Sequence, residues 1–285
     1  MRGRHFNSFY GGGQTKQDRA PKSTTTEEPF NLRFDQFPLR LREGPWSWVA
    51  FVALGGVAAV TGFCLHEARG GWPPDDGPAA ALAPWRARTR LATAAYGVGL
   101  LLVMFRTVGA WPLASYTMVS WSLTTARALL LLGGCRRAAA YLRCASLTQN
   151  AITVLLWWGA IAPAIYVSLP TAAQRAAFAR FNRTPFLVSV HLLNLPLAVV
   201  DHALEPRLLT VADFAASLTL GFAYLLFYLG VLDRRGVHFY IVLSPRTPLC
   251  GVVYGLILAI YYGIFRLVNR QTLAYFPELA PGLGR

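Results

Sequence analysis

The chain has 285 residues, of which 54% are hydrophobic and only 14% are charged. Because soluble domains carry about 25% charged residues, this composition argues against a soluble domain and predicts a membrane protein. The net charge is +14, but the basic residues are spread through short loops between apolar runs. That distribution favours contact with anionic lipid headgroups or acidic partner proteins and argues against nucleic-acid binding.

Residues 1–44 form a polar tail rich in glycine, threonine and proline, and the start of the tail has basic residues but no acidic ones. This start faintly resembles a mitochondrial targeting sequence. A membrane span needs about 20 mainly apolar residues, and about seven segments meet that requirement. In chain order they are 45–65, 91–110, 115–134, 147–169, 184–204, 209–232 and 247–268.

These segments predict an all-α polytopic membrane helix bundle of about seven spans. We divide the chain into five parts: a polar tail (1–44), an extra transmembrane helix (45–65), a linker (66–90), a six-helix membrane domain (91–270) and a C-terminal tail (271–285). No internal repeat is visible, which argues against the inverted-repeat transporter folds.

The third predicted span contains Thr124 and Arg127, which are three residues apart and therefore share a helix face. A hydroxyl beside a buried guanidinium could serve as a nucleophile next to a group that stabilises a developing oxyanion. A structural alternative stays open, in which Thr124 bonds to the carbonyl four residues earlier and Arg127 pairs with Asp201 or Asp213.

The fifth predicted span carries four polar residues that a regular helix places on one stripe: His191, Asn194, Asp201 and His202. Such groups are expensive inside a membrane, so the stripe is a candidate functional site. His191 is a plausible general base, although a structural hydrogen-bonding role is the alternative. The two histidines lie about 16 Å apart along the axis and cannot share one metal ion.

We therefore expect no metal ion and no other cofactor. The four cysteines show no CxxC pair and no spacing typical of zinc or of a disulfide framework. Haem ligation would need a second histidine facing the first at the same depth, and the sequence offers no clear candidate.

Three motifs connect these residues to a known family. Residues 91–270 resemble the androgen-induced multi-pass membrane proteins, which are threonine hydrolases that cleave fatty acid esters of hydroxy fatty acids. Ser122-Leu123-Thr124 resembles the aromatic-Leu-Thr sequence at the family's nucleophile. The other two motifs are Val190-His191-Leu192-Leu193-Asn194-Leu195-Pro196 with Val200-Asp201, and Gly236-Val237-His238-Phe239-Tyr240 with Leu243.

The resemblance implies that Thr124 is the nucleophile and that His191 is its base, with Arg127, Asn194, Asp201 and His202 in support. The chain departs from the family at several positions. Asp201 replaces the usual glutamate, Ile241 replaces a proline, and the next helix has no histidine pair.

Two functions follow as expectations. The first is an intramembrane lipid-ester hydrolase. The second is a non-catalytic accessory subunit of a large membrane complex, for example a mitochondrial respiratory complex, to which the extra span and basic loops give docking surface. Either way we expect membrane lipids and other membrane protein subunits as partners, and we favour the mitochondrial inner membrane over the endoplasmic reticulum. A transporter or channel is a third alternative.

Overall fold

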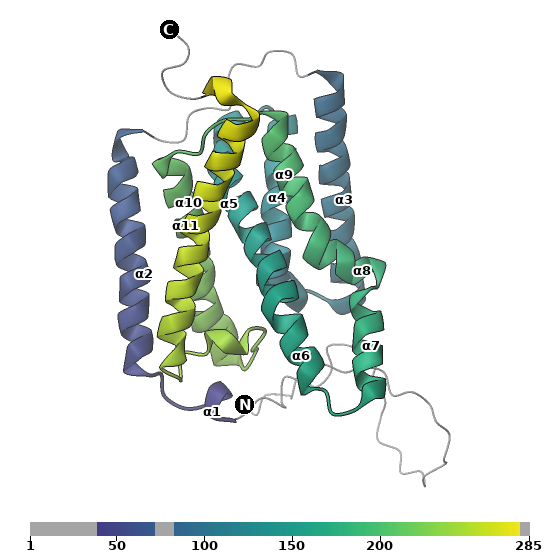
Figure 1. Ribbon diagram of the computed structural model, residues 1–285, viewed down its shortest axis with the longest axis vertical. Coiled ribbons are helices and arrows are strands. Elements are labelled where there is room, and N and C mark those ends of the chain that lie inside the picture. Colours follow the sequence, from purple (N-terminus) through teal and green to yellow (C-terminus); the bar gives the residue numbers. More distant parts are fainter. Residues whose placement is uncertain (1–38, 72–82, 280–285) are drawn as a thin grey trace.

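The computed structural model describes residues 39–71 and 83–279, and every regular element in these two stretches is helical. The all-α prediction is confirmed. Most of the predicted polar tail, the middle of the predicted linker and the last six residues lie outside the described residues. The long helices run side by side along the long axis of the molecule and form a bundle (Figure 1).

The helices are bounded as follows: α1 (Leu39–Arg42), α2 (Trp48–Glu67), α3 (Pro84–Val108), α4 (Tyr116–Leu132), α5 (Arg136–Leu156), α6 (Ala162–Ser168), α7 (Ala172–Asn182), α8 (Pro185–Val188), α9 (Asn194–Leu204), α10 (Val211–Phe227) and α11 (Leu249–Tyr275). Short 3-10 turns occupy Ala68–Gly70, Trp111–Ala114, Asp233–Arg235, Ile241–Leu243 and Pro277–Leu279. Several helices begin at a hydroxyl side chain that accepts a hydrogen bond from their first turn, as Ser115 does for α4 and Thr210 for α10.

Three π-helical turns join or extend these helices: Trp157–Ile161 between α5 and α6, Ser189–Leu193 between α8 and α9, and Tyr228–Leu232 after α10. The first turn ends two residues before Pro163, and the second ends three residues before Pro196. A proline has no N–H to donate four residues back, so the preceding carbonyls are free to take the wider π pattern. Helices 136–168 and 185–204 therefore continue through their π turns.

Five helical runs are long and apolar enough to cross a membrane: Trp48–Gly70, Arg136–Ser168, Pro185–Leu204, Val211–Arg235 and Leu249–Tyr275. The protein is an integral, multi-pass membrane protein. The predicted spans 91–110 and 115–134 are the helices α3 and α4, which do not belong to this set. α3 begins at Pro84, inside the predicted linker, with arginines in its first turns, and α4 has 17 residues.

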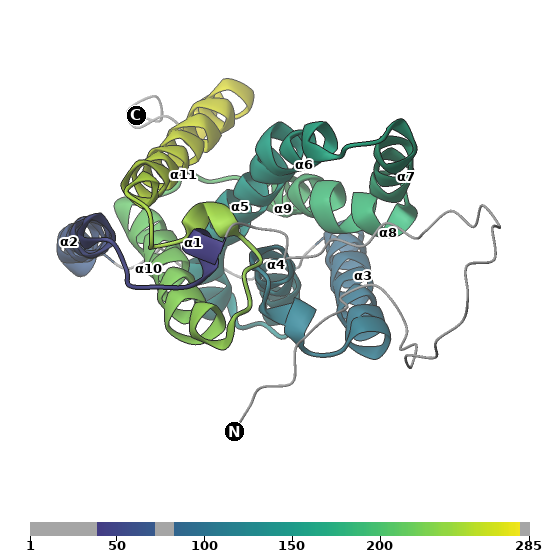
Figure 2. The same ribbon diagram turned by 90° about the horizontal axis from the view of Figure 1, so that it is seen from below.

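Helices α4 and α5 lie at the centre of the bundle, with α3 on one side and α2 at the opposite edge (Figure 2). The extra N-terminal span, α2, packs against α10 and α11. At Gly251 of α11 the contact is close, because an added Cβ would lie 2.8 Å from Val49 Cγ1. The six-helix domain and the extra helix thus form one bundle, whose buried centre includes Met118 and Trp121 of α4.

Candidate active site in the bundle interior

Thr124 lies on α4, is buried, and faces α5. Its Oγ1 accepts a hydrogen bond from Asn150 Nδ2 at 2.7 Å and lies 2.9 Å from Ser146 Oγ. The same hydroxyl is 3.2 Å from the backbone oxygen of Ser120, so the bond to the carbonyl four residues earlier is present as the structural alternative expected. Thr124 is therefore part of a hydroxyl and amide network that joins α4 to α5.

His191 lies in the π turn before α9, and its ring stacks on the indole of Trp157 with centroids 4.0 Å apart and planes at 16°. Its Nδ1 is buried, and the ring interacts with the backbone of Leu187, four residues earlier. Trp158 Nε1 donates to the backbone oxygen of His191 at 2.9 Å. Two π turns thus pack against each other at this histidine, and π turns are frequent at functional sites.

One hydrogen bond fastens the turn before Thr124 to the residue before His191. Trp121 Nε1 donates to the backbone oxygen of Val190 at 3.2 Å, and the side chains of these two residues pack in one buried cluster. No hydrogen bond in the described part of the chain joins Thr124 to His191 themselves.

Asn194 lies nearer to the level of Thr124 than His191 does. Trp121 meets Val190 and Arg127 meets Asp201, so α4 and the fifth-span helix run in the same direction. Thr124 stands midway between the two contacts on α4, and Asn194 lies between them on the other helix. Asn194 is fully buried, and its Nδ2 has no hydrogen-bond partner among the described residues.

Arg127 and Asp201 form a buried ion pair, with Nε 2.5 Å from Oδ2, and Arg127 Nη1 also donates to the backbone oxygen of Ala139. Arg90 Nε lies 3.7 Å from the other oxygen of Asp201. This confirms one of the two pairings considered for Arg127. Asp213, the other partner considered, is held instead by Arg207 through two hydrogen bonds of 2.7 Å.

His202 points to a different set of neighbours. Its Nε2 lies 3.1 Å from Thr272 Oγ1 of α11, and its Nδ1 lies 3.4 Å from Arg143 Nη1 of α5. Arg143 also donates to the backbone oxygen of Glu205, whose carboxylate lies 3.0 Å from Arg90 Nη2. The four polar residues therefore do not share one stripe as predicted for a regular helix. The π turn at Ser189–Leu193 holds an extra residue, and this rotates His191 relative to the later part of the helix.

Sequence reasoning missed the α5 half of this site. Ser146, Asn150 and Thr153 are buried, and their spacing of four and three residues places them on one face of the fourth span. That spacing is a usable signal, since polar residues that recur every three or four positions in an apolar span point into the bundle. No group of three or more histidine, cysteine or acidic side chains within the described ranges could hold a metal ion.

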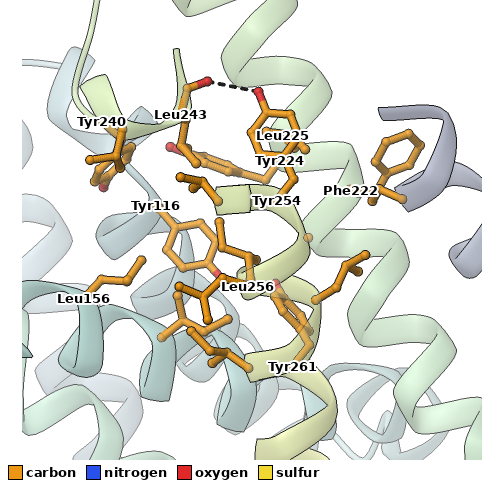
Figure 3. Close-up of a pocket in the computed structure, with 18 of the residues that line it drawn as sticks. Tyr116, Leu156, Phe222, Tyr224, Leu225, Tyr240, Leu243, Tyr254, Leu256 and Tyr261 are labelled. Atoms are coloured by element: carbon orange, nitrogen blue, oxygen red, sulfur yellow. Dashed lines mark hydrogen bonds between the residues drawn. The ribbon is translucent and has the colours of Figure 1, made fainter. Parts of the chain in front are cut away.

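The third motif, at 236–243, forms a loop held to the end of the α10 segment. Gly236 has φ +75°, a left-handed conformation that favours glycine. Asp233 receives two hydrogen bonds from Arg246, of 2.8 and 2.9 Å, and its Oδ1 lies 3.2 Å from His238 Nδ1. The loop places Tyr240 at the wall of a cavity of about 260 Å³ between α4, α5, α10 and α11 (Figure 3). None of the six predicted site residues lines this cavity.

Comparison with protein-family models, with curated proteins and with solved structures found no match for this chain. The resemblance to the androgen-induced proteins therefore stays a prediction that depends on the three motifs. What the helices themselves establish is an all-α, multi-pass membrane protein with a buried polar network at its centre.

Proposed function

We propose that this protein is an intramembrane lipid-ester hydrolase in which Thr124 is the nucleophile and His191 the general base. The observation that carries the proposal is the hydrogen bond from Trp121 to Val190, because it holds the turns that bear these two residues against each other. A backbone partner at Leu187 for one ring nitrogen of His191 sets the tautomer in which the other nitrogen accepts a proton, and this supports the role of base.

The neighbours of Thr124 favour a reactive hydroxyl. Asn150 donates an N–H to Thr124 Oγ1, and a donor at this oxygen stabilises the negative charge that grows as the proton leaves. Asn194 Nδ2 is buried without a protein partner in the described ranges, so it is the donor that we assign to the ester oxyanion. Arg127 and Asp201 neutralise each other and position the helices rather than acting on the substrate.

The reaction then proceeds in two halves. Thr124 Oγ1 attacks the ester carbonyl while its proton passes to His191, directly or through one water, and the carbon–oxygen bond to the alcohol breaks as His191 returns the proton to that oxygen. Water, deprotonated by the same histidine, attacks the acyl-threonine and releases the acid. The acyl substrate enters laterally from the lipid bilayer.

The test is hydrolysis of a long-chain p-nitrophenyl ester by the purified full chain in detergent micelles. We expect Thr124→Ala to abolish hydrolysis and Thr124→Ser to retain part of it, because serine keeps the hydroxyl. Thr125→Ala is the matched control, since Thr125 is equally buried and, among the described residues, its hydroxyl bonds only to the Trp121 carbonyl. Wild-type activity in Thr124→Ala would overturn the proposal.

A second candidate is a non-catalytic subunit of a large membrane assembly, such as a respiratory complex of the mitochondrial inner membrane. It is favoured by a specific observation: the Thr124 hydroxyl already has three neighbours within hydrogen-bond distance, and the cavity lies away from it. Native electrophoresis of membranes solubilised in mild detergent tests this candidate. Migration as a free chain contradicts it. Comigration with a complex supports it if Thr124→Ala also leaves ester hydrolysis unchanged.

A further inference from the structure

The cavity between α4, α5, α10 and α11 is walled by hydrocarbon and by five tyrosines. The tyrosines are Tyr116, Tyr224, Tyr240, Tyr254 and Tyr261, and Figure 3 shows them around one space. Its volume is about 260 Å³, whereas an engineered apolar cavity of about 150 Å³ takes up benzene. The space is therefore large enough for a segment of hydrocarbon chain.

The cavity reaches the surface of the bundle. Two of its lining residues, Val242 and Leu256, are 52% and 56% exposed, and Leu256 lies on α11, a helix long and apolar enough to cross a membrane. None of the described lining residues carries a charge. A carboxylate or phosphate placed here would be desolvated without a cation beside it, so the lining selects an uncharged ligand.

The Tyr240 hydroxyl bonds to Ser115 and Thr117, and the hydroxyls of the other four tyrosines leave one donor available. Tyr224 donates to the backbone oxygen of Ala114 at 3.1 Å, and Tyr254 donates to that of Leu243 at 2.9 Å, which is the dashed line in Figure 3. The hydroxyls of Tyr116 and Tyr261 lie 3.0 Å apart, and a hydrogen bond between them uses only one of their two protons.

Gly221 of α10 makes room for this hydroxyl pair. A Cβ at that position would lie 2.3 Å from the hydroxyl oxygen of Tyr261. The glycine lets the pair sit against α10, and because both tyrosines line the cavity, the second proton of the pair is the one that a ligand oxygen there can accept.

We propose that this cavity binds the chain of an uncharged, single-oxygen membrane lipid, such as a long-chain alcohol, whose oxygen accepts a hydrogen bond from the Tyr116–Tyr261 pair. The site uses neither Thr124 nor His191, so it does not depend on the proposed hydrolase activity. A lipid held here stabilises the packing of α10 and α11 against α4 and α5 and can serve as a permanent part of the bundle.

The test is photo-crosslinking of the full chain in phosphatidylcholine nanodiscs. The probe is a 16-carbon alcohol with a chain diazirine and a terminal alkyne, and the control probe is the corresponding 16-carbon carboxylic acid. We expect the alcohol to label peptides from residues 152–161, 218–225 and 253–261, with much weaker labelling by the acid. Equal labelling by the two probes, or labelling confined to other peptides, would overturn the proposal.

Two pairs of variants separate the cavity from the general lipid surface. Ala160→Trp fills the cavity from an exposed position and should remove the labelling, whereas Ala164→Trp lies on the same helical run outside the lining and should keep it. Tyr261→Phe preserves shape and should weaken alcohol binding roughly three- to tenfold, as expected for one hydrogen bond. Tyr262→Phe, at an exposed neighbour, should have no effect. Unchanged binding in both Ala160→Trp and Tyr261→Phe contradicts the site.

Discussion

The polar network around Thr124 and the tyrosine-lined cavity differ in what their side chains leave available. The network holds the reactive residue types, and most of its hydroxyls and charges are bonded to one another. The cavity holds free space, and its polar groups are tyrosine hydroxyls, two of which donate to backbone carbonyls. The candidate catalytic residues therefore lie in one part of this bundle, and the cavity that could hold a ligand lies in another.

A similar contrast divides the fifth-span helix itself. Near its start, Asn194 has a buried amide nitrogen without a hydrogen-bond partner in the described part of the chain. Near its end, Asp201 Oδ1 and Glu205 Oε2 also make no hydrogen bond, but both carboxylates lie among arginines from α3, α4 and α5. Buried ion pairs fix packing geometry, whereas an uncharged buried donor without a partner is uncommon and calls for a role. The start of the helix is thus the better place to expect chemistry.

The largest expected effect is on activity at the start of the helix. His191→Gln keeps a polar side chain but removes the base, so ester hydrolysis should fall by about 10²–10⁴-fold. The measurement is the initial rate with the p-nitrophenyl ester. The cavity variant Leu256→Trp should keep its rate, because Leu256 lines the cavity from α11, away from the turns that contain Thr124 and His191. If Leu256→Trp loses activity as well, the two regions are not independent.

The second effect is on stability at the end of the helix. Asp201→Asn removes the charge that Arg127 and Arg90 share while both guanidinium groups stay buried, and breaking a buried pair costs about 3–5 kcal/mol. Thermal unfolding of the purified chain in detergent measures the loss. Glu278→Gln, at an exposed position, is the control. Equal Tm values for the two variants would show that the ion pairs do not stabilise the bundle.

A smaller effect is expected at the bond between the two reactive turns. Trp121→Phe removes the indole N–H, so the Val190 carbonyl loses its donor at a cost of about 1–3 kcal/mol. Activity should fall together with stability, because the turn with His191 is no longer fastened to α4. Tyr254→Phe removes a buried bond to the backbone oxygen of Leu243, away from both reactive turns, and is the matched control. If stability falls while activity stays at the wild-type level, this hydrogen bond does not contribute to the proposed chemistry.

The smallest effect concerns the cavity. Gly221→Ala places a Cβ against the Tyr261 hydroxyl and should destabilise the chain by about 1–2 kcal/mol through overpacking. Gly255→Ala on α11 meets nothing within 4 Å and should be neutral or slightly stabilising, because alanine favours helix. Denaturation of both variants in the same detergent provides the comparison. A neutral Gly221→Ala would mean that the tyrosine pair moves freely.

The sequence predicted the fold class and limited the partner of Arg127 to Asp201 or Asp213, because hydropathy and buried charge follow local rules. It did not predict the divided stripe, since a regular helical step cannot anticipate the π turn around His191. The α5 partners of Thr124 were also missed, because contacts between spans depend on how the helices pack. The tyrosines of the cavity come from distant parts of the chain, and only the packing of the helices brings them together.

The most direct measurement is the identity of the residue that an activity-based probe modifies. The purified full chain would be treated with an alkyl fluorophosphonate, which traps activated hydroxyls, and the adduct would be located by mass spectrometry. The hydrolase account predicts an adduct on Thr124 that is lost in His191→Gln. An adduct on another hydroxyl, such as that of Ser146, would contradict it. A protein that forms no adduct and hydrolyses no ester would contradict it as well.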